Sequence, residues 1–116
     1  MANIYKNAFY DPNTTAAVVL YTCPSNANAI IQNIQITNES GSKVVVSKIY
    51  EAATTTTYQI AYASITGPTI CNLAKGPIVL KENDTISLAS TVTTGISATL
   101  AILEINRDDQ NGPKTF

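Results

Sequence analysis

Side chains that could do chemistry are few in this sequence and far apart along it. The 116 residues include no histidine, so the commonest general acid–base group and metal ligand is missing. Asp11, Glu82 and Asp84 could hold calcium if their turns converged, but no spaced Asp-x-Asp-x-Asp loop supports such a site. A glycosidase pair needs two carboxylates facing across a cleft, which eight acids scattered over turns and ends do not indicate. We expect no enzymatic activity, no metal and no cofactor.

The two cysteines, Cys23 and Cys71, favour a structural role. Each is interpreted as a small buried apolar side chain. A disulfide between them is the alternative, if the strands bring the two cysteines together. Without further soft ligands the pair cannot form a zinc site. Serine and threonine are abundant, but as nucleophiles they lack a histidine base and show no lysine-based signature.

Composition and charge exclude further classes of protein. Charged residues make up 13% of the chain and the net charge is −1. Nucleic-acid binding needs clustered basic residues, but the lysines are scattered and Arg107 is the single arginine. No run approaches the roughly 20 apolar residues that span a bilayer, and the start does not resemble a signal peptide. We therefore expect cytoplasmic synthesis, no membrane partner and little charge repulsion against self-association.

The elements that must position these residues read as strands along the whole chain. Apolar and polar residues alternate over residues 29–38, where Ile34 and Ile36 are expected to face a core. Further strands are predicted over residues 15–23, 43–52, 57–66, 85–90 and 96–106. Residues 70–73 are either a short strand or a crossover, and Gly76-Pro77 breaks the chain before residues 78–80. About seven to eight short strands separated by turns predict an all-β fold, an antiparallel β-sandwich of jelly-roll-like type.

Two places in this pattern carry more specific predictions. Gly41 can take the positive φ of a tight hairpin loop, so residues 29–52 are predicted to form a β-hairpin. In the last strand, Leu103 and Ile105 lie on the face opposite to Ile102. Apolar residues on both faces of that strand predict burial against a second surface.

The chain divides into an N-terminal aromatic arm (residues 1–11), a β-sandwich domain (residues 12–107) and a polar C-terminal tail (residues 108–116). Exposed aromatic side chains on an arm are costly and adhesive, so we expect the arm to pack on a neighbouring subunit. Pairing of the arm within its own domain is the alternative. The candidate interface residues are Ile4, Tyr5, Phe9, Tyr10 and Phe116.

Three further tyrosines have two interpretations. Tyr50, Tyr58 and Tyr62 either cap the edge of the core or form a surface that stacks on sugars or on a protein partner. In the second case the sandwich would be lectin-like, with loop side chains such as Asn26, Asn28 and Tyr58 in its binding site.

Several short motifs occur in this sequence in the same order as in a known protein family. The motifs are Leu20-Tyr21-Thr22-Cys23-Pro24, Ala29-Ile30-Ile31-Gln32-Asn33-Ile34, Gly76-Pro77-Ile78-Val79-Leu80 and Glu82-Asn83-Asp84-Thr85-Ile86. In this order they resemble small virion structural proteins of tailed bacteriophages, of the marine and cyanobacterial type, over roughly residues 17–105. The sequence departs from that family at Asn83, where glycine is common, but asparagine tolerates the same left-handed turn.

The resemblance implies a non-enzymatic virion protein, made in the cytoplasm of a host bacterium. The implied role is a capsid decoration or cement protein that forms a homo-oligomer, with a trimer as the expected state. Its implied partners are copies of itself and the major capsid protein or tail proteins. A tail, baseplate or fibre component is the alternative within this class, and a lectin-like module that binds host glycans is the alternative outside it.

Overall fold

The computed structural model describes residues 2–106, so the predicted tail and its Phe116 lie outside the described residues. Every regular element within residues 2–106 is a β-strand. This part of the chain accordingly holds no helix of the length and hydropathy that crossing a membrane requires. The strands are β1 (Ala2–Tyr10), β2 (Val18–Thr22), β3 (Ala27–Asn38), β4 (Ser42–Glu51), β5 (Thr56–Thr66), β6 (Thr69–Asn72), β7 (Ile78–Leu80), β8 (Thr85–Ser90) and β9 (Ile96–Asn106).

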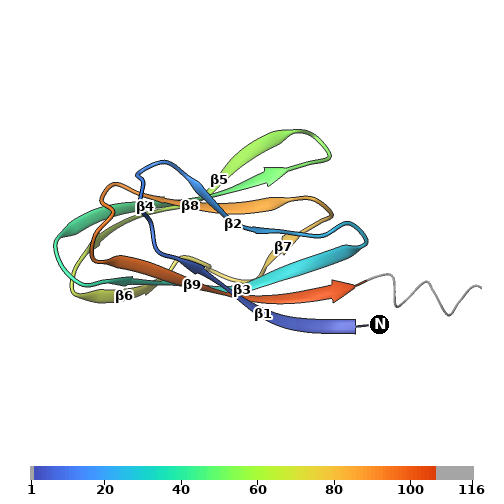
Figure 1. The fold of residues 1–116 in the computed structure, drawn as a ribbon, viewed down its shortest axis with the longest axis horizontal. Coiled ribbons are helices and arrows are strands. Elements are labelled where there is room, and N and C mark those ends of the chain that lie inside the picture. The colour runs from blue at the N-terminus through green and yellow to red at the C-terminus, as the bar shows by residue number, and fades with distance from the viewer. Residues whose placement is uncertain (1, 107–116) are drawn as a thin grey trace, which may run out of the picture.

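These strands form two antiparallel sheets that face each other (Figure 1). The five-stranded sheet has the order β1-β9-β3-β6, and β7 pairs with a separate stretch of β3. The four-stranded sheet has the order β2-β8-β4-β5. The prediction of an all-β, antiparallel, jelly-roll-like sandwich is therefore confirmed. The described residues hold nine strands, more than predicted, because the N-terminal segment is itself a strand.

The core lies between the sheets and follows from the alternation in the sequence. Ile34 and Ile36 of β3 are fully buried, as are Leu100 of β9 and Leu88 of β8. Burial of each of these large aliphatic side chains stabilises the fold by about 2 kcal/mol relative to leaving the side chain exposed. The alternation predicted for β3 and β9 thus points the expected residues inward.

The predicted hairpin over residues 29–52 is wrong. β3 pairs with β9, β6 and β7, whereas β4 pairs with β5 and β8, so the two strands belong to different sheets. Gly41 does have a positive φ of 74°, but its turn carries the chain across the sandwich rather than back along the same sheet. Within the described residues, β4 and β5 are the consecutive strands that pair with each other. A turn signal alone does not distinguish a hairpin from such a crossing.

The segment predicted as an arm is an edge strand over most of its length. β1 pairs with β9 in an unbroken antiparallel register from Ala2 opposite Asn106 to Tyr10 opposite Ala98. The backbone of this segment therefore pairs within its own domain, which is the alternative prediction. The ladder satisfies backbone groups that a free arm would leave to water. Packing of its outward side chains on a neighbouring subunit stays a prediction.

Candidate assembly face

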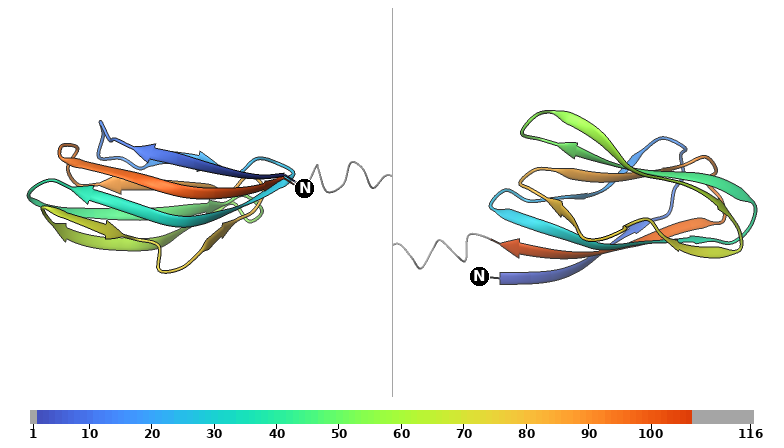
Figure 2. Two further views of the ribbon diagram at one scale, coloured as in Figure 1. Left: turned by 90° about the horizontal axis from the view of Figure 1, so that it is seen from below. Right: turned by 180° about the vertical axis from the view of Figure 1, so that it is seen from behind.

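The outer surface of the five-stranded sheet carries the strongest candidate site. Strand register places Tyr5 of β1 and Ile30 of β3 on either side of Leu103 of β9. Ile30 is opposite Val79 of β7 in turn. Opposite residues in an antiparallel pair share a face, with Cβ atoms roughly 5 Å apart. These four side chains, which we call the apolar row, therefore cross the sheet at right angles to its strands. The ribbons of β1, β9, β3 and β7 are seen from this side in Figure 2, left.

The apolar row is open to solvent at both ends. Tyr5 is 74% exposed and Val79 is 59% exposed, while Leu103 and Ile30 between them are half-buried. Ile105, two residues beyond Leu103 on the same face, is also half-buried. Single apolar side chains on a surface need no explanation, but a group of them on one face is typical of an interaction site.

No outward position of this sheet carries a charge. The outward residues around the apolar row are uncharged amides, hydroxyls and small or apolar side chains: Asn3, Asn7, Phe9, Asn28, Gln32, Asn33, Gln35, Thr37, Ile70, Asn72, Ser97, Thr99 and Ala101. Depletion of charge is what distinguishes the centre of protein interfaces from ordinary surface. We call this surface the uncharged face.

The uncharged face is hollowed in two places. A shallow hollow of about 140 Å³ lies beside the apolar row, where Tyr5 and Asn7 meet Gln32 at the irregularity in the pairing of β3 with β9, and Lys6 also contributes to its lining. A larger one of about 550 Å³ lies at the end of β3 and the start of β6. Its lining residues are Thr37, Asn38, Glu39, Pro68, Thr69 and Ile70.

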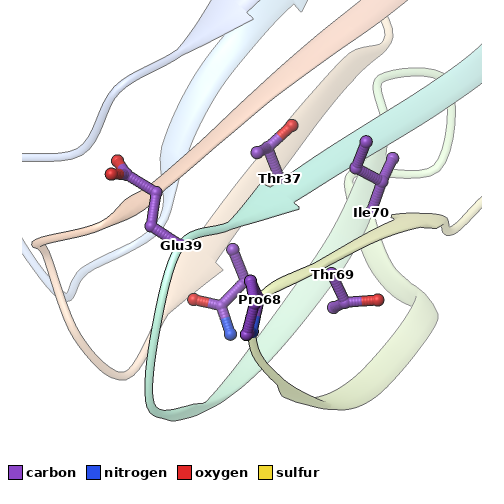
Figure 3. Close-up of a pocket in the computed structure, with 6 residues that line it drawn as sticks. Thr37, Glu39, Pro68, Thr69 and Ile70 are labelled. Atoms are coloured by element: carbon purple, nitrogen blue, oxygen red, sulfur yellow. The ribbon is translucent and has the colours of Figure 1, made fainter.

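The larger hollow extends the uncharged face rather than forming a separate chemical site. Thr37 and Ile70 point to the same side, and the carboxylate of Glu39 points away from Pro68 (Figure 3). The amide of Asn38 is already engaged, because it donates to the Gly41 carbonyl oxygen at 3.0 Å and accepts from Lys43. The larger hollow is therefore better suited to packing against apolar side chains of a partner than to binding a polar ligand.

The structure separates the predicted interface residues. Tyr5 and Phe9 lie on the uncharged face. Ile4 and Tyr10 point the other way, because alternate residues of a strand face opposite sides; Tyr10 is 1% exposed and belongs to the core. Ile4 is partly exposed near the end of the sandwich. Phe116 is outside the described residues. Tyr10 is therefore not accessible to a partner in this fold.

Sequence reasoning missed two members of the apolar row, Ile30 and Val79. Both stand in short aliphatic runs in which the neighbouring residue, Ile31 or Leu80, is the one that faces the core. A run that is apolar on both faces is the signal that could have found them, as it does for Leu103 and Ile105 in the last strand. The apolar row depends on which strands are neighbours in the sheet. Pairing between strands that are distant in the sequence cannot be predicted from local residue spacing.

One cluster of titratable side chains lies between the sheets. Lys6 Nζ is 3.1 Å from Glu104 Oε2, and the Tyr21 hydroxyl donates a hydrogen bond of 2.6 Å to the same oxygen. Burial raises the pKa of Glu104, but the hydrogen bonds from Tyr21 and Lys6 and the charge of Lys6 outweigh it and hold the pKa below its usual value. Burial and the contact with Glu104 raise the pKa of Tyr21. The cluster connects β1 and β9 to β2, and it acts as a tie between the sheets.

A second buried charge lies at the opposite end of the sandwich. Lys43 is buried, and its ammonium group donates to Asn38 Oδ1 and to the Ser40 carbonyl oxygen. Gly67 packs against this amide so closely that a Cβ there would lie 2.7 Å from Asn38 Nδ2. The cluster thus fixes the two turns that carry the chain between the sheets at this end.

The acids considered for calcium serve different purposes. Asp84 is buried, and its two carboxylate oxygens accept hydrogen bonds from the Ala52 and Lys81 amides at 3.0 and 2.9 Å. Asp11 is exposed in the connection that follows β1, whereas Asp84 ends the turn that leads into β8. A hollow of about 260 Å³ beside Asp84 includes Glu51 and Glu82 in its lining. Among the described residues no group of three such ligands is arranged to hold a metal ion.

The side chains named for a lectin-like site do not share one pocket. Asn28 lines the hollow beside Asp84, Asn26 sits in the turn before β3 with a φ of 66°, and Tyr58 lies on β5. Tyr58 and Tyr62 are largely exposed, and the side chain of Tyr50 is exposed to a lesser degree, at 36%. Tyr58 and Tyr62 do not bury against the core as caps would, because β5 is the outer strand of its sheet, whereas Tyr50 lies near the end of β4.

The two cysteines occupy different environments. Cys23 is fully buried, and its thiol donates to the Ala27 and Leu80 carbonyl oxygens at 3.5 and 3.8 Å. Cys71 is half-buried on β6, where it is opposite Ile36. Both are thiols, so the structure contains no disulfide between them. The prediction of a small buried side chain is confirmed for Cys23.

Comparisons with known proteins identify the fold but no family. Neither a family model nor a curated protein matches the sequence. Among solved structures, the chain is similar to a mutant VP2 protein of infectious bursal disease virus in derived T=1 particles, with a TM-score of 0.55 and 11% identity. The match covers 95% of this chain and 31% of that one, so this chain spans about a third of the VP2 length.

Two further solved structures superpose less closely. The VP2 subviral particle of infectious bursal disease virus gives a TM-score of 0.45 at 7% identity, covering 96% of this chain and 34% of that one. The virus-like particle of the extra small virus of the prawn Macrobrachium rosenbergii gives 0.37 at 14% identity, covering 90% and 79%. At the identity of the VP2 match the likeness establishes a fold: this chain has a β-sandwich of the kind found in a viral capsid protein.

Proposed function

We propose that this protein is a non-enzymatic structural component of a virus particle and that it binds copies of itself through the uncharged face. The observation that carries the proposal is the apolar row on a face without charge, from Tyr5 to Val79. The VP2 protein whose fold it shares was solved as an assembled T=1 particle, which supports an assembly role for this sandwich.

A second copy of the chain is the occupant that fits this face. Two uncharged faces can approach each other without like charges meeting, and exposed apolar side chains at both ends of the row lose water on contact. The surrounding exposed asparagines, such as Asn3 and Asn7, each offer both a donor and an acceptor. Amide borders of this kind are complementary to themselves, because each amide can pair with another.

In its finer form the proposal follows the sequence resemblance to tailed-phage proteins. The protein would be a capsid decoration or cement protein that forms a homotrimer and binds the major capsid protein. Tyr5 and Phe9 would then contact the neighbouring subunit from the outward side of β1. A tail, baseplate or fibre position would use the same self-contact with tail proteins as partners.

Light scattering coupled to size exclusion, over a range of concentrations, tests the self-contact. The variant Val79→Lys places a charge at the end of the apolar row. Val19→Lys is the matched control, because Val19 is 55% exposed on the outer side of the other sheet. We expect an oligomer for the wild type and the control, and at least a tenfold weaker association for Val79→Lys, as a buried unpaired charge costs over about 1.4 kcal/mol.

A wild type that stays monomeric at all concentrations contradicts self-assembly through this face. Specific binding on a glycan array would then favour the lectin-like alternative. Equal association of Val79→Lys and Val19→Lys would place the contact elsewhere on the molecule.

A further inference from the structure

The open edge of the four-stranded sheet is a second surface on which a partner can bind. β5 is the last strand in that sheet and pairs with β4 on one side. An edge strand presents a row of backbone N–H and C=O groups, which is a template for pairing with another strand. At 11 residues, Thr56–Thr66 is a long strand to leave in this state.

The other edges of the sandwich carry features that oppose strand addition. β1 has Lys6 on its inward side. β2 has 5 residues and an irregular register between Val19 and Tyr21. β6 and β7 have 4 and 3 residues and follow Pro68 and Pro77. Inward charges, short length, bulges and proline are the usual ways in which proteins protect an edge.

β5 carries neither a charged residue nor a proline. Its one irregularity lies opposite Ser47 and Lys48, where the pairing with β4 shifts at Ile60. From Ala61 to Thr66 the register is continuous, so this half of the strand is regular. It is therefore the least protected edge in the described part of the chain.

β5 also projects beyond the body of the sandwich. Tyr58 is opposite Ile49 and shares its face, yet it is mostly exposed, whereas Ile49 packs against the core. Figure 1 shows the β4–β5 hairpin rising above the rest of the fold. Tyr62, at 66% exposure, lies on the opposite face of the strand.

A hollow of about 370 Å³ runs along this edge, between β5 and the segment around β6. Its lining is mostly apolar, with Ile60, Ala63, Cys71 and Leu73, and it includes one charged side chain, Lys75. Apolar side chains are therefore accessible beside the backbone edge. A strand added to β5 could fill this hollow with its own side chains, which would bury apolar surface in addition to forming the ladder.

We propose that β5 pairs antiparallel with β5 of a second copy, so that two four-stranded sheets become one continuous sheet. A second copy fits because both strands are uncharged from Thr56 to Thr66, so their pairing brings no like charges together. In a two-fold antiparallel pair, Tyr62 of each strand lies near the other, as cross-strand aromatic pairs favour. This contact is separate from the uncharged face, and its argument does not depend on a role in a virus particle.

Hydrogen exchange of the full chain, measured at low and high protein concentration, tests this pairing. We expect amides within Thr56–Thr66 to exchange about tenfold more slowly at high concentration, because outward N–H groups gain partners. Ser64→Lys, which adds a charge at an exposed position of β5, should abolish this difference. Val19→Lys, on the opposite edge of the same sheet, should retain it.

The outcomes separate this inference from the proposed function. If Val79→Lys reduces association while Ser64→Lys leaves association and β5 exchange unchanged, the β5 pairing is wrong and the uncharged face stands. If Ser64→Lys reduces association and Val79→Lys does not, the β5 pairing stands and self-association through the uncharged face is wrong. Should Ser64→Lys fail to fold by circular dichroism, Thr57→Lys, also exposed on β5, gives the same test. Concentration-independent exchange of β5 in an associating wild type would overturn the pairing.

Discussion

Glu104 and Lys43 are buried charged side chains at opposite ends of the sandwich, and the two are stabilised by different means. At one end, Glu104 meets a cation and a phenol, Lys6 and Tyr21. At the other, Lys43 meets neutral acceptors, the Asn38 amide and a backbone carbonyl. A paired charge gains attraction from its partner, whereas a charge held by dipoles depends on their geometry. The Lys43 end should therefore tolerate change less well.

The largest expected effect is at Asn38. Asn38→Ala leaves the Lys43 ammonium with one of its two described acceptors and removes the hydrogen bond to Gly41. We expect a loss of about 3–5 kcal/mol in the free energy of unfolding, because a buried charge loses its compensation. Urea denaturation measures it.

A double-mutant cycle identifies the source of this loss. In a Lys43→Met background the charge is absent, so Asn38→Ala should cost roughly half as much or less. An equal cost in both backgrounds would mean that Asn38 acts through its turn alone, and the contrast between the two ends would fail.

Glu104 is expected to have the next largest effect. Glu104→Gln keeps the size of the side chain and removes its charge, so the hydrogen bond from Tyr21 weakens and Lys6 loses its counter-ion. We expect a loss of about 2 kcal/mol, smaller than at Asn38 because Lys6 is 42% exposed and regains water. Thermal unfolding of this variant beside Asn38→Ala would rank the two ends; a larger loss for Glu104→Gln would reverse the comparison.

The two ends should also differ in their response to acid. The pKa of Glu104 is lower in the folded state than its ordinary value of 4.5. Its contribution to stability is therefore complete above that value and is lost as the pH falls through the folded pKa. The stability difference between the wild type and Glu104→Gln should shrink on acidification. Asn38→Ala retains Glu104, so its acid dependence should match the wild type; equal slopes for all three proteins would contradict this role of Glu104.

The smallest expected effect is at Lys6. Lys6→Met keeps the apolar stem and removes an ammonium group that water already reaches, so we expect a loss of roughly 0.5–1 kcal/mol. Chemical denaturation in low and high salt measures it. The wild type should approach the variant at high salt, because screening weakens a partly exposed ion pair.

Local spacing predicted the strands well, since inward positions such as Ile34 and Leu100 follow directly from alternation. It failed wherever the answer depends on which strands are neighbours. The hairpin predicted at Gly41 is wrong, because a positive φ serves a crossing between sheets equally well.

Tyr10 was likewise grouped with Tyr5 although the two lie on opposite faces of one strand. Glu104 and Lys6 are too far apart along the chain for any local pattern to bring them together. The apolar row has the same origin, because it is a product of register between strands.

The position of β9 has a consequence for how this chain folds as it is synthesised. β9 lies between β1 and β3, so β1 must wait for β9, which follows it late in the chain, before it gains a hydrogen-bonded neighbour. Until residues 96–106 have left the ribosome, the outward aromatic residues of β1 belong to an unpaired, adhesive segment. Such non-local pairing folds slowly and exposes the nascent chain to premature association. Completion of the five-stranded sheet, and with it of the uncharged face, is thereby delayed until synthesis of the domain ends.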